Sequence, residues 1–113
     1  MKLVKVLDIF HIEYGNSLEL NKLTQDLEGI NFISRTAKNN GVSAKVKILD
    51  SITPTPANTI TVALGGSVLS TFLQPEPFYS GYHIFCLIPK STMTEEEKLF
   101  YCSIVSWLWN KGK

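Results

Sequence analysis

The sequence has few cysteines and no long apolar run. Its two cysteines, Cys86 and Cys102, lie among apolar neighbours, and no histidine lies at the spacing that a zinc site needs. We interpret them as buried free thiols, which are typical of a reducing compartment. Lys5 and Asp8 interrupt the apolar residues at the start, which fit neither a signal peptide nor a membrane span. These absences predict a cytoplasmic protein that holds no metal or cofactor and contacts no membrane.

Net charge is also small, and the charged residues are unevenly placed. The formal net charge is +1, so composition alone does not indicate nucleic-acid binding, and any such function depends on local charge. Residues 29–49 contain four cations and no acid, whereas residues 51–75 contain no charged side chain. Acids gather instead at Glu95, Glu96 and Glu97. The basic stretch is therefore the first candidate for a polyanion-binding surface.

Local patterns predict several strands within one domain, which we expect to span residues 1–113. Alternating or β-branched residues predict strands over residues 10–14, 59–64, 68–73 and 82–88. The last segment is nearly all apolar, which is typical of a buried central strand. Gly65 and Gly66 predict a hairpin turn between the second and third strands.

Other segments have weaker patterns, apart from one clear helix. Prolines predict a loop over residues 50–58, and residues 78–81 are expected to form an aromatic turn. Residues 3–7 fit a helical turn or a strand, and three leucines weakly indicate a helical face: Leu20, Leu23 and Leu27. Thr94-x-x-Glu97 matches a helix-capping box, and Gly112 is expected to end that helix. Its predicted apolar face contains Phe100, Ile104, Trp107 and Leu108.

Residues 31–47 predict a strand, a tight turn and a second strand. Apolar and polar residues alternate along the second arm, and Asn39, Asn40 and Gly41 tolerate the positive φ that tight turns require. Arg and Lys can hold phosphates, and Asn can contact adenine edges. The candidate DNA contacts are Ser34, Arg35, Lys38, Asn39, Asn40 and Lys45. A solvated hairpin that binds nothing is the alternative.

A second candidate cluster combines aromatic and polar side chains. Its members are Gln74, Phe78, Tyr79, Ser80, Tyr82 and His83. Aromatic rings beside an amide and an imidazole are suited to the edge of a DNA groove. The alternative is the margin of an apolar core.

Catalytic interpretations are weak. Glu96-x-Lys98 after Asp50 imitates the order of a nuclease motif, but acids in the first helical turn are expected from capping. No nucleophile or carboxylate lies at a recognisable spacing from His83. Residues 65–67 lack the lysine of a phosphate-binding loop. The sequence therefore predicts a protein that is not an enzyme.

Three blocks of the chain together resemble a known family. INFISRTAKNNGVS, then TITVALGGSVLSTFLQPEPFYSGYHIFCLIPK, then MTEEEKLFYC are similar to the target recognition domain of type I restriction–modification specificity subunits and BcgI-like specificity subunits. The resemblance runs from about residue 8 to residue 104. It implies an α+β fold, with a twisted, mostly antiparallel sheet and a C-terminal amphipathic helix. It also implies sequence-specific binding of double-stranded DNA, while DNA methyltransferase and restriction subunits act as partners.

The resemblance assigns site residues by position. The implied DNA contacts are Ser34, Arg35, Lys38, Asn39, Asn40, Ser67, Gln74, Tyr79 and Ser80, and the structural turns are Gly41, Gly65, Gly66 and Gly81. Lys45, from the basic stretch, and His83, from the aromatic cluster, complete the expected DNA contacts. Much of this pattern recurs in domains that recognise different sequences. It therefore implies a role in holding the fold and the DNA backbone more than in selecting bases.

The end of the chain departs from the family pattern. The basic segment and the long helix that follow in relatives are missing, which fits a truncated gene product, an isolated domain or a small protein that reuses the fold. Trp107 and Trp109 are foreign to the pattern and are expected to cover core or to mediate self-association. An alternative function follows: a protein-interaction module, or a mimic of a specificity subunit, that does not bind DNA alone.

Overall fold

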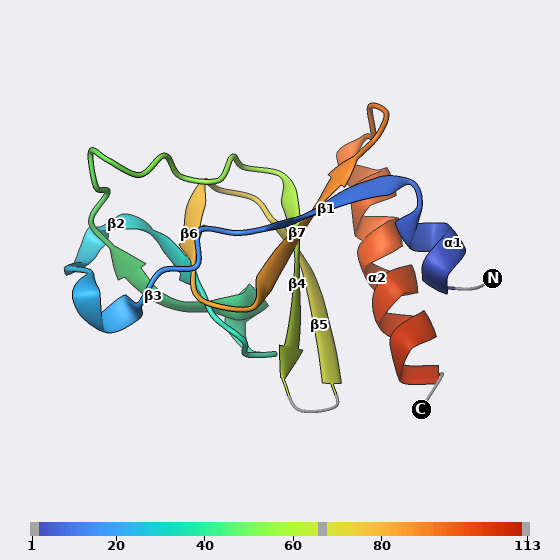
Figure 1. Cartoon of the computed structure of the whole chain (residues 1–113), viewed down its shortest axis with the longest axis horizontal. Helices are drawn as coiled ribbons and strands as arrows, with labels where there is room; N and C mark the ends of the chain where they lie inside the picture. The colour runs from blue at the N-terminus through green and yellow to red at the C-terminus, as the bar shows by residue number, and fades with distance from the viewer. Residues whose placement is uncertain (1–2, 66–67, 112–113) are drawn as a thin grey trace.

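The computed structural model describes residues 3–65 and 68–111 and places two β-sheets side by side, with helices on the outer face of one sheet (Figure 1). In chain order the elements are α1 (Leu3–Leu7), β1 (Phe10–Tyr14), the 3-10 turn η1 (Leu20–Lys22), β2 (Gln25–Ile33), the 3-10 turn η2 (Asn39–Gly41), β3 (Val42–Val46), β4 (Thr59–Gly65), β5 (Val68–Gln74), β6 (Phe78–Ser80), β7 (Ile84–Pro89) and α2 (Glu95–Lys111).

The larger sheet is antiparallel and carries the helices. Its strand order is β1-β7-β4-β5, so β7 is an interior strand, as its apolar sequence predicts, and β4 and β5 form the predicted hairpin. Both helices lie against one face of this sheet (Figure 1). The buried core at this face contains Val6, Phe10, Ile60, Leu73, Leu87, Cys102 and Val105. Burial of these apolar side chains stabilises the packing of α1 and α2 on the sheet.

The smaller sheet contains the basic stretch. Its order is β3-β2-β6, with β2 antiparallel to β3 and parallel to β6. A second core joins the two sheets and contains Ile33, Ala63, Phe78, Ile84 and Cys86. A third cluster in the smaller sheet contains Phe32, Val46 and Tyr79. This packing fixes β2 and β3, and the loop between them, relative to the larger sheet.

The expected fold class is confirmed, although the strands divide into two sheets. The chain is α+β, its strands are mostly antiparallel and a helix lies near its C-terminal end. Residues 3–7 form a helix, which settles the open alternative at that segment.

Two local predictions are wrong. The leucine pattern at residues 20–27 gives a 3-10 turn followed by β2, and Leu27 is 91% exposed, so it belongs to no buried helical face. Residues 78–80 form strand β6 rather than an aromatic turn. Their parallel pairing with β2 connects segments far apart in the sequence, and pairing at that distance leaves no local signal.

The predicted capping box at the start of α2 is confirmed. The Glu97 N–H donates to the Thr94 hydroxyl at 3.1 Å, and the Thr94 N–H donates to the Glu97 carboxylate at 3.0 Å. These bonds satisfy backbone groups that the helix itself leaves unpaired. Gly112 lies outside the described residues. No helix in the part of the chain that the structure describes is long and apolar enough to cross a membrane.

The predicted apolar face of α2 is partly wrong. Phe100 and Trp107 are 54% and 55% exposed, whereas Cys102 and Val105 are buried against the sheet. Apolar residues occur on several sides of α2, so their spacing does not select one face. The Lys111 ammonium lies 4.5 Å from the centre of the Trp107 ring. The expected self-association through Trp107 and Trp109 receives no support, since Trp109 instead lines an apolar groove between α1, α2 and the larger sheet.

Both cysteines are buried free thiols, as predicted. Burial raises the pKa of Cys86 to about 11, and the negative charge of Glu13 adds to this effect. Burial raises the pKa of Cys102 to about 12. Both thiols therefore stay protonated at neutral pH and pack as small apolar side chains.

Candidate nucleic-acid interface

The cationic loop, residues 34–41, joins β2 to β3 and forms the centre of the candidate site. The Ser34 N–H donates to the Gly41 carbonyl at 2.9 Å, and the Gly41 N–H donates to the Lys38 carbonyl at 2.9 Å. Asn39, Asn40 and Gly41 have φ angles of 51°, 56° and 84°, in the region that Asn and Gly adopt most readily. The predicted turn signal is therefore correct, although the loop is longer than a tight turn.

Four exposed cations lie in this loop or along the strand that follows it. Arg35 and Lys38 lie in it, and Lys45 and Lys47 lie on or just after β3, on either side of the buried Val46. Within residues 3–65 and 68–111, none of the four forms an ion pair with an acid; the ion pair of Lys22 with Glu19 lies elsewhere. Their positive charge is therefore not neutralised by the protein and is available to phosphates.

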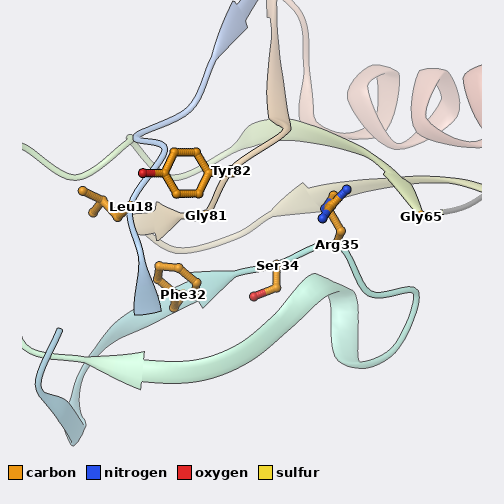
Figure 2. A pocket seen from close by; sticks show the side chains of 7 residues that line it. All are labelled: Leu18, Phe32, Ser34, Arg35, Gly65, Gly81 and Tyr82. Carbon is orange, nitrogen blue, oxygen red and sulfur yellow. The ribbon is translucent and has the colours of Figure 1, made fainter. Parts of the chain in front are cut away.

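A cleft of about 530 Å³ lies next to the cationic loop. Its lining comes from four segments and consists of Leu18, Phe32, Ser34, Arg35, Gly65, Gly81 and Tyr82. Figure 2 shows Leu18 and Tyr82 on one side, Arg35 toward Gly65 on the other, and between them Phe32 on β2 and Ser34 just after its end. The cleft thus combines a cation, a hydroxyl and an aromatic ring, and the ring of Tyr82 is half-exposed. These groups can contact phosphate, sugar and base.

Two amide side chains, Gln74 and Asn40, join the cationic loop to β5. The Gln74 Nε2 donates to the Asn40 carbonyl at 2.9 Å and to the Thr61 hydroxyl at 3.1 Å. The Asn40 Nδ2 donates in return to the Leu73 carbonyl at 3.1 Å. We call Gln74 and Asn40 the amide pair. Its bonds hold the cationic loop against the larger sheet.

Comparison with known protein families identifies the chain. The profile described as the type I restriction modification DNA specificity domain matches residues 1–112. The chain belongs to this family of DNA specificity domains. The match covers nearly all of the 113 residues and confirms the resemblance carried by the three sequence blocks. A comparison with curated protein sequences found no match.

Solved specificity subunits share the fold of this domain. The crystal structure of a type I restriction–modification system S subunit from M. genitalium matches with a TM-score of 0.64 and 19% identity, over 94% of this chain and 26% of that one. The HsdS subunit from Thermoanaerobacter tengcongensis matches with a TM-score of 0.65 and 13% identity, over 94% of this chain and 27% of that one. The specificity domain therefore spans about a quarter of each of these subunits.

Three side chains expected to contact DNA are buried in the specificity domain, which corrects their assignment. Gln74, Tyr79 and Ser80 are at most 1% exposed. The Tyr79 hydroxyl donates to the Ile52 carbonyl at 2.6 Å, and the Ser80 hydroxyl accepts the Asn16 N–H at 2.9 Å. Protein atoms therefore enclose all three side chains, and the hydroxyls of Tyr79 and Ser80 bond the backbone of Ile52 and Asn16.

The other expected contacts fall into three groups. Ser34, Arg35, Lys38 and Asn39 lie in the cationic loop, and Lys45 lies on β3 opposite Asn31 of β2. The Asn40 amide points back to β5, so its donor is already used within the protein. His83 is exposed in the turn before β7, with a φ of 61°.

The structure describes three of the four glycines that are expected to form turns. Gly41 has the positive φ that the turn signal requires. Gly65 ends β4 and Gly81 follows β6, and both line the cleft. Gly66 and Ser67 lie outside the described residues.

The cleft itself was not predicted from the sequence. Tyr82 and Arg35 lie far apart in the sequence, and no local pattern links them to each other or to Leu18 and Phe32. Their proximity depends on β2 pairing with β6 and on packing between the sheets. No group of three or more His, Cys, Asp or Glu side chains gathers among the described residues in a way that could hold a metal ion.

Proposed function

We propose that this chain binds double-stranded DNA as a target recognition domain of a restriction–modification system. The observation that carries the proposal is the set of four exposed cations without acidic partners on the cationic loop and β3, beside a cleft with an exposed aromatic ring. Such a surface suits a phosphate backbone, whose contacts supply most of the affinity for duplex DNA. Membership in the specificity-domain family supports the same ligand.

The proposed contacts divide by chemistry. Lys38, Lys45 and Lys47 bind phosphates, because a flexible ammonium group acts as a point charge. Arg35, at the cleft, binds a phosphate through its planar guanidinium, which can bond two phosphate oxygens. Asn39, in η2, and His83, in the turn before β7, contact the groove. General affinity therefore rests on the four cations, and sequence preference rests on the residues that contact the groove.

We propose that the domain performs no chemistry itself. Of the nuclease-like set, the Lys98 ammonium donates to the Asn58 carbonyl at 2.8 Å, and Glu96 lies in the first turn of α2 beside the capping residue Glu97. Lys98 therefore has a structural partner, and an acid at Glu96 is explained by the helix dipole. A DNA methyltransferase and restriction subunits are the proposed partners that would modify or cut the bound DNA. This part of the proposal rests on family membership.

A gel-shift assay with a pool of random duplexes tests DNA binding. At low salt, about 50 mM, we expect the 113-residue protein to retard the pool, and repeated selection to enrich a common sequence. The double variant Lys38→Ala/Lys45→Ala should bind weakly. The matched control, Lys5→Ala/Lys90→Ala, loses the same charge from exposed positions away from the cationic loop and should bind normally.

The alternative function predicts a different outcome. A protein-interaction module would give no retardation at low salt and would still co-purify with a methyltransferase subunit. Equal binding by both double variants would also contradict the proposed surface.

A further inference from the structure

We propose that the amide pair, Gln74 and Asn40, is a positioning device that holds the cationic loop in its DNA-binding shape before DNA arrives. This inference rests on the proposed function and assigns Gln74 a role opposite to that expected from the sequence. Gln74 does not touch DNA, because it is 1% exposed. It acts on DNA binding through the backbone of Asn40.

The contacts of the amide pair are reciprocal. From the end of β5, the Gln74 Nε2 donates to the Asn40 carbonyl, while the Asn40 Nδ2 donates to the carbonyl of Leu73, the neighbour of Gln74. The Gln74 amide therefore bonds the backbone of Asn40, and the Asn40 amide bonds the backbone of the residue before Gln74. This arrangement ties η2 to β5 at two points and resists both sliding and lifting of the loop.

The backbone of the loop needs such support. Asn39 and Asn40 are consecutive non-glycine residues with positive φ, a conformation that L-residues disfavour and that persists where the surroundings enforce it. The fit at Gly41 is also tight: an added Cβ would lie 3.2 Å from Ile33 Cγ2 and 3.4 Å from Phe72 Cδ2. The loop is therefore seated closely against both sheets.

The amide oxygen of Gln74 indicates that this residue has a role other than stabilising the fold. Its Oε1 is buried and has no hydrogen-bond partner among the described residues. An unpaired buried acceptor is unfavourable, and a methionine of similar volume would fill the site without one. Within the part of the chain that the structure describes, the side chain of Gln74 makes its hydrogen bonds through Nε2, and one of them holds the cationic loop.

Positioning the loop in advance lowers the entropic cost of binding. Lys38 lies immediately before η2, and Arg35 lies earlier in the same loop. If the loop were free, DNA binding would have to order it, and that ordering would subtract from affinity. Removing the amide pair should therefore weaken binding without removing any cation.

Two variants with matched controls test the inference. Gln74→Met keeps volume but loses both Nε2 bonds, and Gln25→Met makes the same change at an exposed position of β2. Asn40→Gly keeps a backbone that accepts positive φ but loses the Nδ2 bond, and Asn58→Gly makes the same change at another residue with positive φ, 63°. Thermal unfolding of each variant shows whether the fold is retained.

Hydrogen exchange and duplex titration supply the readouts. In the free protein, Gln74→Met and Asn40→Gly should accelerate exchange of the Ser34 and Gly41 N–H groups at least about tenfold. Their duplex affinity should fall about five- to tenfold, with an unchanged dependence on salt, because every phosphate-binding cation remains. Both control variants should match the unaltered protein.

The outcomes separate this inference from the proposed function. Normal duplex affinity in Gln74→Met, or unchanged loop exchange in the free variant, would overturn the positioning role alone. A fall in affinity with a weaker salt dependence would also overturn it, since lost phosphate contacts would then explain the effect. Failure of the unaltered protein to bind any duplex would overturn the proposed function itself.

Discussion

Replacing Arg35 by alanine gives the sharpest electrostatic prediction. Arg35 is exposed in the cationic loop, lines the cleft and has no acidic partner among the described residues. Its removal therefore breaks no ion pair within the protein. The variant should fold normally and lose one contact to DNA. Lys5→Ala is the matched control, because it removes one exposed charge from α1 and leaves the same net charge.

The expected size follows from counterion release. Each phosphate contact changes the slope of log affinity against log salt by about −0.9, so four contacts give a slope of about −3.6. Between about 50 and 200 mM salt, the affinity of the unaltered protein should therefore fall about 150-fold. Loss of one contact weakens binding about eightfold at about 0.1 M salt, which equals about 1.2 kcal/mol.

Fluorescence anisotropy of a labelled duplex measures both quantities. Arg35→Ala should show a slope about 0.9 less negative than that of the unaltered protein. Lys5→Ala should reproduce the unaltered slope. An equal change in both variants would show that only net charge matters, and it would refute a defined contact surface at the cationic loop.

Three further predictions concern stability. Burial raises the thiol pKa of Cys86 to about 11 and that of Cys102 to about 12, from about 9 in the unfolded chain. Below pH 9 the two thiols therefore do not lower the free energy of unfolding. It should then fall by about 1.4 kcal/mol per pH unit for each thiol between pH 9 and those values, and urea unfolding of Cys102→Ala should show a shallower fall. Thr94→Ala removes the capping box and should lower the free energy of unfolding by about 1 kcal/mol in urea titrations, and an unchanged value would contradict the capping role. Tyr79→Phe removes the hydroxyl that joins β6 to residues 49–52 and should cost about 2 kcal/mol in the same assay, whereas a neutral effect would show that these bonds add nothing.

Local chemistry made much of the fold predictable. Alternation along residues 10–14, β-branched residues along β4 and the Asn-Asn-Gly signal each depend on neighbours in sequence, and the structure bears them out. The capping box at Thr94 is predictable for the same reason. Such signals place elements without showing how those elements meet in space.

The remaining features depend on pairing over long distances. Strand β6 forms because Phe78, Tyr79 and Ser80 pair in parallel with β2. No turn residues and no hydrophobic periodicity in the sequence predict that pairing. Gln74 resembles a surface amide in sequence, yet packing between the sheets buries it beneath the cationic loop. The DNA site at the loop therefore stays a prediction, and the burial of Gln74 beneath that loop could be found only from the structure.

Mapping the DNA-bound surface tests the central claim most directly. A titration of an isotope-labelled sample of the protein with a selected duplex, followed by NMR, reports on each backbone amide. We predict that the amides of Ser34, Arg35, Lys38, Asn39 and Lys45 shift with DNA, together with those around Tyr82 and His83, while those of α2 stay constant. Shifts confined to α2, or no shifts at low salt, would contradict DNA binding through the cationic loop.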